Sequence, residues 1–250
     1  MARQKHTPRV YVDAPLAVGE RLELPEAKRH HLATVLRLSA DDDLTLFNGD
    51  GGEYAARVLE ATRKRLVVAV ETRHTPTRES ALDLTLVQAV ARGDRMDFAL
   101  AKAVELGVRR IRPLFTARGQ VRLDGERLAK KQAHWQAVAE SAAEQSGRLV
   151  CPTVDPAVDM AQLLNEPAEP GETLRLMLAP EAARSLSKIA PAMRVALLIG
   201  PESGLSHDEI ERAAAANWQA LTLGPRILRT ETAGMAAIAA LQTAWGDLAG

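Results

Sequence analysis

The stretch "ALLIGPESGLSHDEIERA", from Ala196 to Ala213, joins an apolar run to a helix through a turn rich in glycine. Residues 195–199 are apolar and mostly branched, which is the pattern of a strand buried on both faces. Ser206 precedes Glu209 by three residues, the spacing of a capping box, and Leu205 and Ile210 have the spacing of a hydrophobic staple. The sequence therefore predicts a buried strand, a turn over residues 200–204 and a helix that begins at Ser206.

The turn Gly200-Pro201-Glu202-Ser203-Gly204 occupies a place where ligands often bind. In α/β proteins, ligands usually lie at the carboxyl ends of the strands. The turn has no G-x-G-x-x-G pattern and no Gly-Lys-Ser/Thr, which excludes those two nucleotide-binding devices. The local sequence leaves two interpretations equally open: a ligand-binding turn, or a tight connection that needs glycine for backbone reasons alone.

Composition limits the class of protein. The chain has 250 residues, 46% apolar and 26% charged, as expected of a soluble globular protein of one or two domains. It contains no apolar stretch of membrane-spanning length, and its first residues lack the apolar core of a signal peptide. Its single cysteine, Cys151, excludes an internal disulfide and favours the cytoplasm. The six histidines show no metal-ligand spacing, so no metal is expected.

The charge balance neither requires nor excludes a nucleic-acid partner. The chain has 32 basic and 32 acidic residues, but basic residues cluster at positions 28–31, 63–65 and 109–112. Each cluster can be a solvated face or a track for phosphates. Aromatic residues make up only 3% of the chain, which argues against a platform on which bases stack.

Two halves of the chain differ in pattern. Residues 1–72 contain five short, partly alternating segments that predict strands, with one helix near residues 27–36 and a hairpin signal at residues 48–52, which suggests a small barrel. Residues 73–80 are polar and without periodicity, as in a linker. From residue 81 onward, predicted strands at 82–90, 109–116, 173–180, 194–201 and 219–225 alternate with helices, which predicts a wound, mostly parallel sheet.

A second turn repeats the first. Gly224-Pro225 follows the predicted strand "QALTL", as Gly200-Pro201 follows the strand before it. Arg229 and Glu231 then stand at the start of a helix made largely of alanine. From composition alone, these two residues form an ordinary ion pair at a helix start.

The two turns together resemble a known family. "IGPESGLSHDEI" and "LGPRILRTETA" are similar to the RsmE family of 16S ribosomal RNA uracil-N3 methyltransferases, which belongs to the knotted SPOUT superfamily. "PRVYV", "ARGDRMDFALAKAVELGV" and "AAEQSGR" extend the resemblance over nearly the whole chain. The sequence departs from the family at Ser203, where glycine is usual, which raises a question about the backbone angle there.

The resemblance implies a fold and a cofactor. It implies a PUA-like RNA-binding β-barrel over residues 1–72, a linker over 73–80, and a SPOUT methyltransferase domain with a trefoil knot over 81–250. S-adenosylmethionine would lie among three turns, and glycine would let the backbone approach the adenosine closely. The residues implied for cofactor binding are Leu178, Ala179, Ile199, Gly200, Pro201, Glu202, Gly204, Leu223, Gly224, Ile227, Leu228 and Thr230.

The resemblance also implies catalytic groups. The methyl group of S-adenosylmethionine is already activated, so the reaction needs no metal, but the uracil N3 must lose its proton. Arg229 is the candidate for binding the developing anion or a phosphate, because its charge is permanent and its donors form a planar fork. Glu202 and Glu231 are both candidate bases or groups that orient Arg229, and the sequence does not rank them.

The implied partners are the 16S RNA of the small ribosomal subunit and a second copy of the chain. The candidate RNA-binding residues are Arg9, Lys28, Arg29, Arg92 and Arg148. A homodimer is expected through the last helix, with Met235, Ile238, Leu241 and Trp245 on its own sheet and an alanine face that includes Ala237 toward the partner.

Two alternatives stay open at this point. One is a knotted methyltransferase that acts on another RNA, such as a transfer RNA or 23S ribosomal RNA. The other is an RNA-binding ribosome-assembly factor without catalytic activity.

Overall fold

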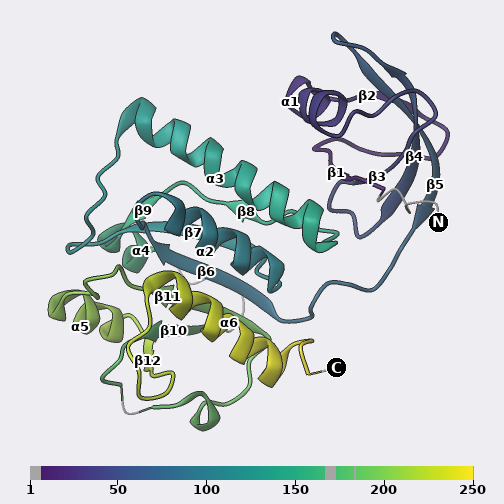
Figure 1. Cartoon of the computed structure of the whole chain (residues 1–250). Coiled ribbons are helices and arrows are strands. Elements are labelled where there is room, and N and C mark those ends of the chain that lie inside the picture. The colour runs from purple at the N-terminus through teal and green to yellow at the C-terminus, as the bar shows by residue number, and fades with distance from the viewer. Residues whose placement is uncertain (1–6, 167–172, 183, 250) are drawn as a thin grey trace. The chain divides into compact units, whose positions relative to one another are not determined.

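The computed structural model describes residues 7–166, 173–182 and 184–249. Residues 1–6 of the predicted barrel and residues 167–172, 183 and 250 of the predicted catalytic domain lie outside this description. The chain divides into two compact units (Figure 1). Unit 1 comprises residues 1–79 and 143–151, and unit 2 comprises residues 80–142 and 152–250.

Unit 1 is built on a five-stranded sheet. Its strands are β1 (Arg9–Tyr11), β2 (Arg21–Glu23), β3 (Asp43–Phe47), β4 (Glu53–Ala61) and β5 (Leu66–His74), in the order β1-β3-β4-β5-β2. β1 pairs with β3 in parallel, and the other pairs are antiparallel. Alternate residues of β4 are buried, because strand side chains point to opposite faces and one face covers the apolar core of this unit. The predicted β-rich fold and the hairpin between β3 and β4 are confirmed.

The predicted helix of unit 1 is present but changes its winding partway. Helix α1 (Glu26–His30) continues directly into a π-helical turn, η1 (His31–Val35). The chain leaves this turn through Arg37, whose φ of 54° lies in the left-handed region. The N–H of Leu38 donates to the carbonyl oxygen of Leu32 at 3.0 Å and closes the helix end.

Residues 143–151 belong to unit 1 because their polar groups bind it. The carboxylate of Glu144 accepts hydrogen bonds from the N–H of Tyr11 at 2.9 Å and from Lys28 at 2.7 Å. Arg148 donates to Glu79 at 2.9 Å and also forms an ion pair with it. The division expected at residues 72–81 did not include this segment, because its attachment depends on contacts between residues far apart in the sequence.

Unit 2 is an α/β layer structure around a parallel sheet. The strand order is β12-β10-β11-β6-β7-β8, with β9 paired to β7, and all pairs are parallel. The strands are β6 (Asp83–Ala89), β7 (Arg110–Phe115), β8 (Thr153–Val154), β9 (Val158–Asp159), β10 (Leu174–Leu178), β11 (Arg194–Ile199) and β12 (Gln219–Leu221). The predicted wound sheet is confirmed. The short strands β8 and β9 were not predicted.

Helices accompany the strands of unit 2. They are α2 (Asp94–Glu105), α3 (Gly125–Ser146, whose last turn is in unit 1), α4 (Met160–Asn165), α5 (His207–Ala215) and α6 (Thr230–Trp245), with a 3₁₀ turn, η2 (Leu186–Lys188). Helix α6 lies beside α2 in Figure 1. No helix within the described residues is both long and apolar enough to span a membrane.

The buried face of α6 differs from the expected one. Thr230, Gly234, Ala237, Ile238, Leu241 and Gln242 are buried. Ile238 and Leu241 pack inward as predicted, but Met235 and Trp245 are only partly buried. Ala237 is 1% exposed and therefore packs within its own unit, so assigning it to a partner-facing surface was wrong. A helix that is apolar nearly all round does not specify its inner face by pattern alone.

Candidate active site

Three turns meet at one edge of the unit 2 sheet. Strand β10 lies between β12 and β11, and all three run parallel, so the turns that follow them emerge at the same edge. Hydrogen bonds join neighbouring turns: the N–H of Ala179 donates to Leu221 at 3.0 Å, and the N–H of Thr222 donates to Arg184 at 2.9 Å. The predicted turns after "LRLMLAP", at residues 200–204 and at residues 223–230 are therefore neighbours in space.

A buried chain of hydrogen bonds connects the second turn with the third. The hydroxyl of Thr230 donates to the carbonyl oxygen of Gly200 at 2.7 Å. The same hydroxyl accepts a hydrogen bond at 3.0 Å from the amide of Gln88, which is fully buried in β6. Gln88 pairs in register with Ile199, the residue before Gly200. Gln88 thus fixes the hydroxyl that ties the two turns together.

Sequence reasoning missed Gln88. The signal was available, because Gln88 is a polar residue within the apolar run of a strand predicted to be buried. A buried amide needs hydrogen-bond partners. Its partner Thr230 stands 142 residues further along the chain, so the pairing could not be read from the local pattern.

The turn over residues 200–204 needs glycine at one position for its backbone. Gly204 has a φ of +71°, and its N–H donates to Pro201 at 2.9 Å. A side chain at Gly204 would meet open space, so the requirement is conformational rather than steric. Ser203 has no positive φ, which answers the question raised by its departure from the family pattern. Its hydroxyl donates instead to the carbonyl of Arg118 at 2.9 Å.

The start of α5 is held as predicted. Ser206 is the N-cap, and its hydroxyl accepts from the N–H of Glu209, while Glu209 accepts from the N–H of Ser206 at 2.8 Å. Glu209 is 3% exposed and also accepts from the N–H of Ala117 at 2.7 Å. The capping box is confirmed, and Glu209 additionally connects this turn to the segment after β7.

The three catalytic candidates have different surroundings. Arg229 is exposed at the N-cap of α6. Glu202 forms an ion pair with Arg95 at 3.1 Å. Glu231 lies in the first turn of α6, and its Oε2 atom is buried without a hydrogen-bond partner among the described residues. Within the described ranges no ion pair joins Arg229 to either carboxylate, so the simple helix-start pair does not form.

The remaining cofactor-binding candidates supply apolar surface and backbone groups. Leu178, Ala179, Leu223 and Leu228 are partly exposed at the edge, and the side chain of Ile227 is 86% exposed. Ile199 and Pro201 are buried, so Ile199 offers only backbone groups to a ligand. Gly224 has a backbone exposed to solvent. The structure thus brings the predicted set together along one sheet edge.

The RNA-binding candidates separate into free and engaged cations. Arg92, just past the end of β6, is exposed. Arg9 forms an ion pair with Glu53 and stacks on Phe47, and burial together with the nearby Arg78 lowers its pKa. Lys28 forms an ion pair with Glu144, and Arg148, which is only 4% exposed, forms one with Glu79. Arg29 belongs to a pocket described below. Sequence could not reveal these partners, because they come from distant segments.

No group of three or more His, Cys, Asp or Glu side chains within the described part of the chain is arranged to hold a metal ion.

The chain is similar to known RNA methyltransferases in both of its parts. Residues 78–242 match a family described as RNA methyltransferase domain, and residues 24–71 match one described as RNA methyltransferase PUA domain. The fold, the site and these matches define an RNA methyltransferase preceded by a PUA domain. A ribosomal RNA small subunit methyltransferase E from Buchnera aphidicola subsp. Schizaphis graminum is 32% identical, over 98% of this chain and 99% of the relative. The chain belongs to this family, ribosomal RNA small subunit methyltransferase E.

Two solved structures agree with this assignment. A methyltransferase from Legionella pneumophila in complex with the bound cofactor SAM is 38% identical, with a TM-score of 0.92 over 97% of this chain and 100% of that one. The ribosomal RNA small subunit methyltransferase E from Neisseria gonorrhoeae, bound to S-adenosyl methionine, is 41% identical, with a TM-score of 0.90 and the same coverage. The predicted family, the methyltransferase class and the α/β fold preceded by a PUA-like domain are confirmed. The trefoil knot stays a prediction.

Proposed function

We propose that this protein transfers the methyl group of S-adenosylmethionine to the N3 atom of a uridine in the 16S RNA of the small ribosomal subunit. The observation that carries the proposal is the set of three turns joined at one sheet edge, in a chain 38% and 41% identical to solved relatives that bind this cofactor. A ribosomal RNA substrate would place the protein in the cytoplasm.

The residues at the sheet edge suit the cofactor. Partly exposed Leu178, Leu223 and Leu228 and the exposed Ile227 offer apolar surface for an adenosine. The buried, unpartnered Oε2 atom of Glu231 is the kind of group that a cationic ligand would satisfy. When bound, S-adenosylmethionine supplies a methyl group on a sulfonium, which needs no metal for activation. The turn after β10, with Leu178 and Ala179 at its start, and the turns at residues 200–204 and 223–230 would hold it.

The side chains beside these turns would handle the uracil. The base must lose its N3 proton, which leaves negative charge on its carbonyl oxygens. Arg229, exposed at the start of α6, would bind that charge or a neighbouring phosphate. Glu231 and Glu202 remain the two candidates for accepting the proton. Glu202 forms an ion pair with Arg95, whereas the Oε2 atom of Glu231 has no hydrogen-bond partner among the described residues.

Exposed Arg92 would contact the RNA backbone beside this edge, and Arg29 would do so from unit 1. Arg9, Lys28 and Arg148 would contact RNA only if its phosphates replaced the carboxylates that these side chains now bind. Such contacts with phosphates weaken as salt rises.

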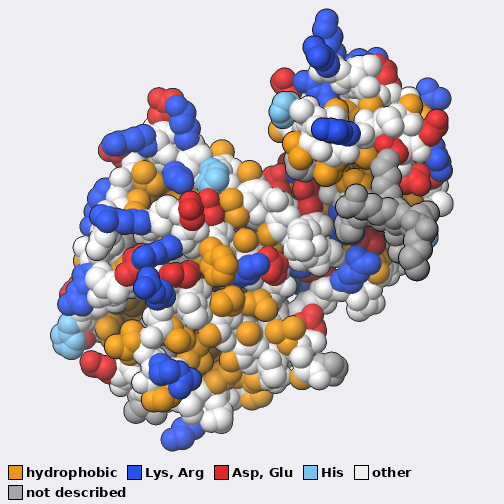
Figure 2. Space-filling view, in the orientation of Figure 1, with side chains coloured by type: hydrophobic (Ala, Val, Ile, Leu, Met, Phe, Trp, Pro, Cys, Tyr) orange, Lys and Arg blue, Asp and Glu red, His pale blue; other side chains and the backbone are white. Residues whose placement is uncertain are grey.

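A homodimer through α6 is part of the proposal. Figure 2 shows hydrophobic side chains gathered over the region of α6 and α2. Ala233, Ala236 and Ala240 are partly exposed on α6, and Phe98 on α2 is 45% exposed. Small side chains allow a second helix to approach closely, and a two-fold arrangement is the commonest form of soluble oligomer.

The proposed function is tested by its product. Purified protein is incubated with S-adenosylmethionine and either 16S RNA, assembled small subunits, 23S RNA or transfer RNA, and nucleosides are identified by mass spectrometry. N3-methyluridine in 16S RNA, and in no other RNA, is the expected result. Arg229→Gln should bind the cofactor normally in calorimetry but lose most of the methylation. A methylated base other than uridine, or cofactor binding without any product, would contradict the proposal.

A further inference from the structure

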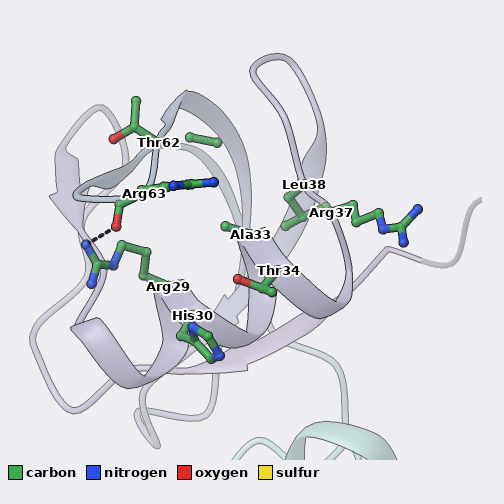
Figure 3. A pocket seen from close by; sticks show the side chains of 9 residues that line it. Arg29, His30, Ala33, Thr34, Arg37, Leu38, Thr62 and Arg63 are labelled. Atoms are coloured by element: carbon green, nitrogen blue, oxygen red, sulfur yellow. Dashed lines mark hydrogen bonds between the residues drawn. The ribbon is translucent and has the colours of Figure 1, made fainter.

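Unit 1 carries a basic pocket that the proposed active site does not use. Its volume is about 660 Å³, and it lies between the helical segment α1–η1 and the β4–β5 turn (Figure 3). This volume falls in the range of ligand sites, roughly 300–1,000 Å³. It is lined by Arg29, His30, Ala33, Thr34, Arg37, Leu38, Ala61, Thr62 and Arg63. The lining contains three arginines and two hydroxyls but no carboxylate.

Two arginines of this pocket, Arg37 and Arg63, differ from Arg57, Arg65 and Arg73 of the same unit. Arg57 binds Glu71 and Asp43, Arg65 binds Glu23 and Glu60, and Arg73 binds Asp50, so each of these has an acidic partner. Arg37 and Arg63 make no ion pair with any described residue, and both are exposed. Arg29 meets Glu26 at 3.1 Å, but that carboxylate is 88% exposed and weakly held. The pocket therefore retains positive charge that the fold does not neutralise.

The structure positions these side chains. Arg29 donates to the carbonyl oxygen of Arg63 at 2.7 Å, which holds the helix and the turn together at the mouth of the pocket. In Figure 3 the side chain of Arg63 points toward Ala33 and Thr34. The side chain of Arg37 points in the other direction, away from Arg29 and Arg63. The cations are thus spread along a rim rather than focused on one point.

The backbone at Arg37 is strained. Its φ of 54° costs a residue with a side chain roughly 1–2 kcal/mol, and glycine is the usual residue at such a helix end. It follows a π-helical turn, a rare geometry that occurs often at functional sites. An arginine at this position, with no ion-pair partner in the described ranges, indicates a charge kept for a ligand.

We infer that this pocket binds the sugar-phosphate backbone of the RNA substrate, with Arg63, Arg37 and Arg29 contacting successive phosphates and Thr34 donating a hydroxyl hydrogen bond. The inference rests on the proposed function for the identity of the ligand as RNA. Base stacking contributes little, because the described lining holds no Phe, Tyr or Trp and its one ring is the imidazole of His30, while Phe47 and Tyr54 of this unit are buried. Recognition is therefore electrostatic and independent of sequence.

The test compares arginines that differ in their partners. Full-length wild-type protein, the double variant Arg37→Gln/Arg63→Gln and the control Arg65→Gln are titrated with transcribed 16S RNA by fluorescence anisotropy at several KCl concentrations. Arg65 lies two residues from Arg63 but is paired with Glu23 and Glu60. The double variant should bind RNA about tenfold more weakly at low salt, with a salt slope shallower by roughly 0.7–0.9 for each phosphate that is no longer neutralised. Arg65→Gln should bind like the wild type.

Two further measurements keep the outcome clear. Affinity for S-adenosylmethionine, measured by calorimetry, should be unchanged in all three proteins, which shows that unit 2 is intact, and thermal melting reports on unit 1. If the folded double variant binds 16S RNA with wild-type affinity and salt slope, or if Arg65→Gln weakens binding equally, the inference is overturned. If the wild type yields no methylated RNA but the double variant still binds RNA more weakly, the pocket stands and the proposed function fails.

Discussion

The hydroxyl of Thr230 lies 2.7 Å from the carbonyl oxygen of Gly200 and joins the turn after β11 to the start of α6. Because both turns belong to the proposed cofactor site, this hydrogen bond couples the packing of α6 to the shape of that site. Thr230 is 4% exposed, and its hydroxyl also accepts from Gln88, so no solvent replaces either bond if the hydroxyl is removed.

The first prediction concerns this hydroxyl. Thr230→Val keeps the shape of the side chain but removes the donor to the carbonyl of Gly200 and leaves the amide of Gln88 with only its hydrogen bond to Ala89, at a cost of about 1–3 kcal/mol. Calorimetry should show a loss of S-adenosylmethionine affinity of about tenfold, with part of the cost appearing as a lower melting temperature. Thr230→Ser retains the hydroxyl and should bind within a few-fold of the wild type. Equal affinities in the wild type and Thr230→Val would show that the two turns are held by other contacts.

The second prediction concerns Gln88, which is not among the proposed cofactor-binding residues but positions Thr230, which is one of them. Gln88→Leu should weaken cofactor binding through Thr230, so the double variant Gln88→Leu/Thr230→Val should lose little more affinity than Thr230→Val alone. Residues in one hydrogen-bond network give such non-additive effects. A double-mutant cycle in which the two losses simply add would contradict a positioning role for Gln88.

The third prediction uses the backbone of the first turn. Gly204→Ala should strain a turn with φ of +71° by about 1–2 kcal/mol without any clash, since open space surrounds the position. The strain should reduce S-adenosylmethionine affinity several-fold in a folded protein. Gly51→Ala in unit 1 is the matched control, because Gly51 has a φ of +83° and equally open surroundings. If both variants bind the cofactor like the wild type, the turn over residues 200–204 does not shape the site.

Local signals carried most of what the sequence predicted. The strand before Gly200 and the helix start at Ser206 were predictable because an apolar run and a capping box are written in adjacent residues. The meeting of the three turns was implied by the family resemblance, and it agrees with a parallel sheet, which places carboxyl strand ends together.

The rest depended on contacts across the fold. The Gln88–Thr230 bond, the Glu79–Arg148 pair and the carboxylate partners of Arg9 and Lys28 each join residues that are distant in the sequence. The inner face of α6 was misassigned at Ala237, because alanines occur on every side of that helix and burial there is decided by its neighbours.

The fourth prediction tests the proposed dimer. Ala236→Arg places a long cation on the partly exposed face of α6, where a symmetry-related helix would approach. Light scattering should find the wild type as a dimer and Ala236→Arg as a monomer with reduced methylation. Ala214→Arg makes the same change at an exposed position on α5 and should leave a dimer. A wild-type protein that is monomeric at micromolar concentration and active would refute the proposal.

The fifth prediction follows from the ion pair of Glu79 with Arg148. Burial alone would raise the pKa of Glu79, but hydrogen bonds and charge from Arg148, together with the N–H groups of Leu149 and Val150, hold its pKa below the ordinary value. A carboxylate with a lowered pKa stabilises the fold above its unfolded pKa of about 4.3, and the contribution is lost as pH falls through the lower folded value.

Glu79→Gln should therefore destabilise the protein at neutral pH and matter less in acid. Removing one charge from a buried pair costs about 3 kcal/mol, so the melting temperature at pH 7 should fall by roughly 5–10 °C. The difference in melting temperature between the wild type and Glu79→Gln should become smaller as the pH is lowered from about 5 toward 3. Glu71→Gln is the control: its carboxylate meets the partly exposed Arg57 at 2.9 Å, a surface pair worth at most about 1 kcal/mol. A gap for Glu79→Gln that stays constant with pH would show that the charge of Glu79 does not hold residues 148–150 in unit 1.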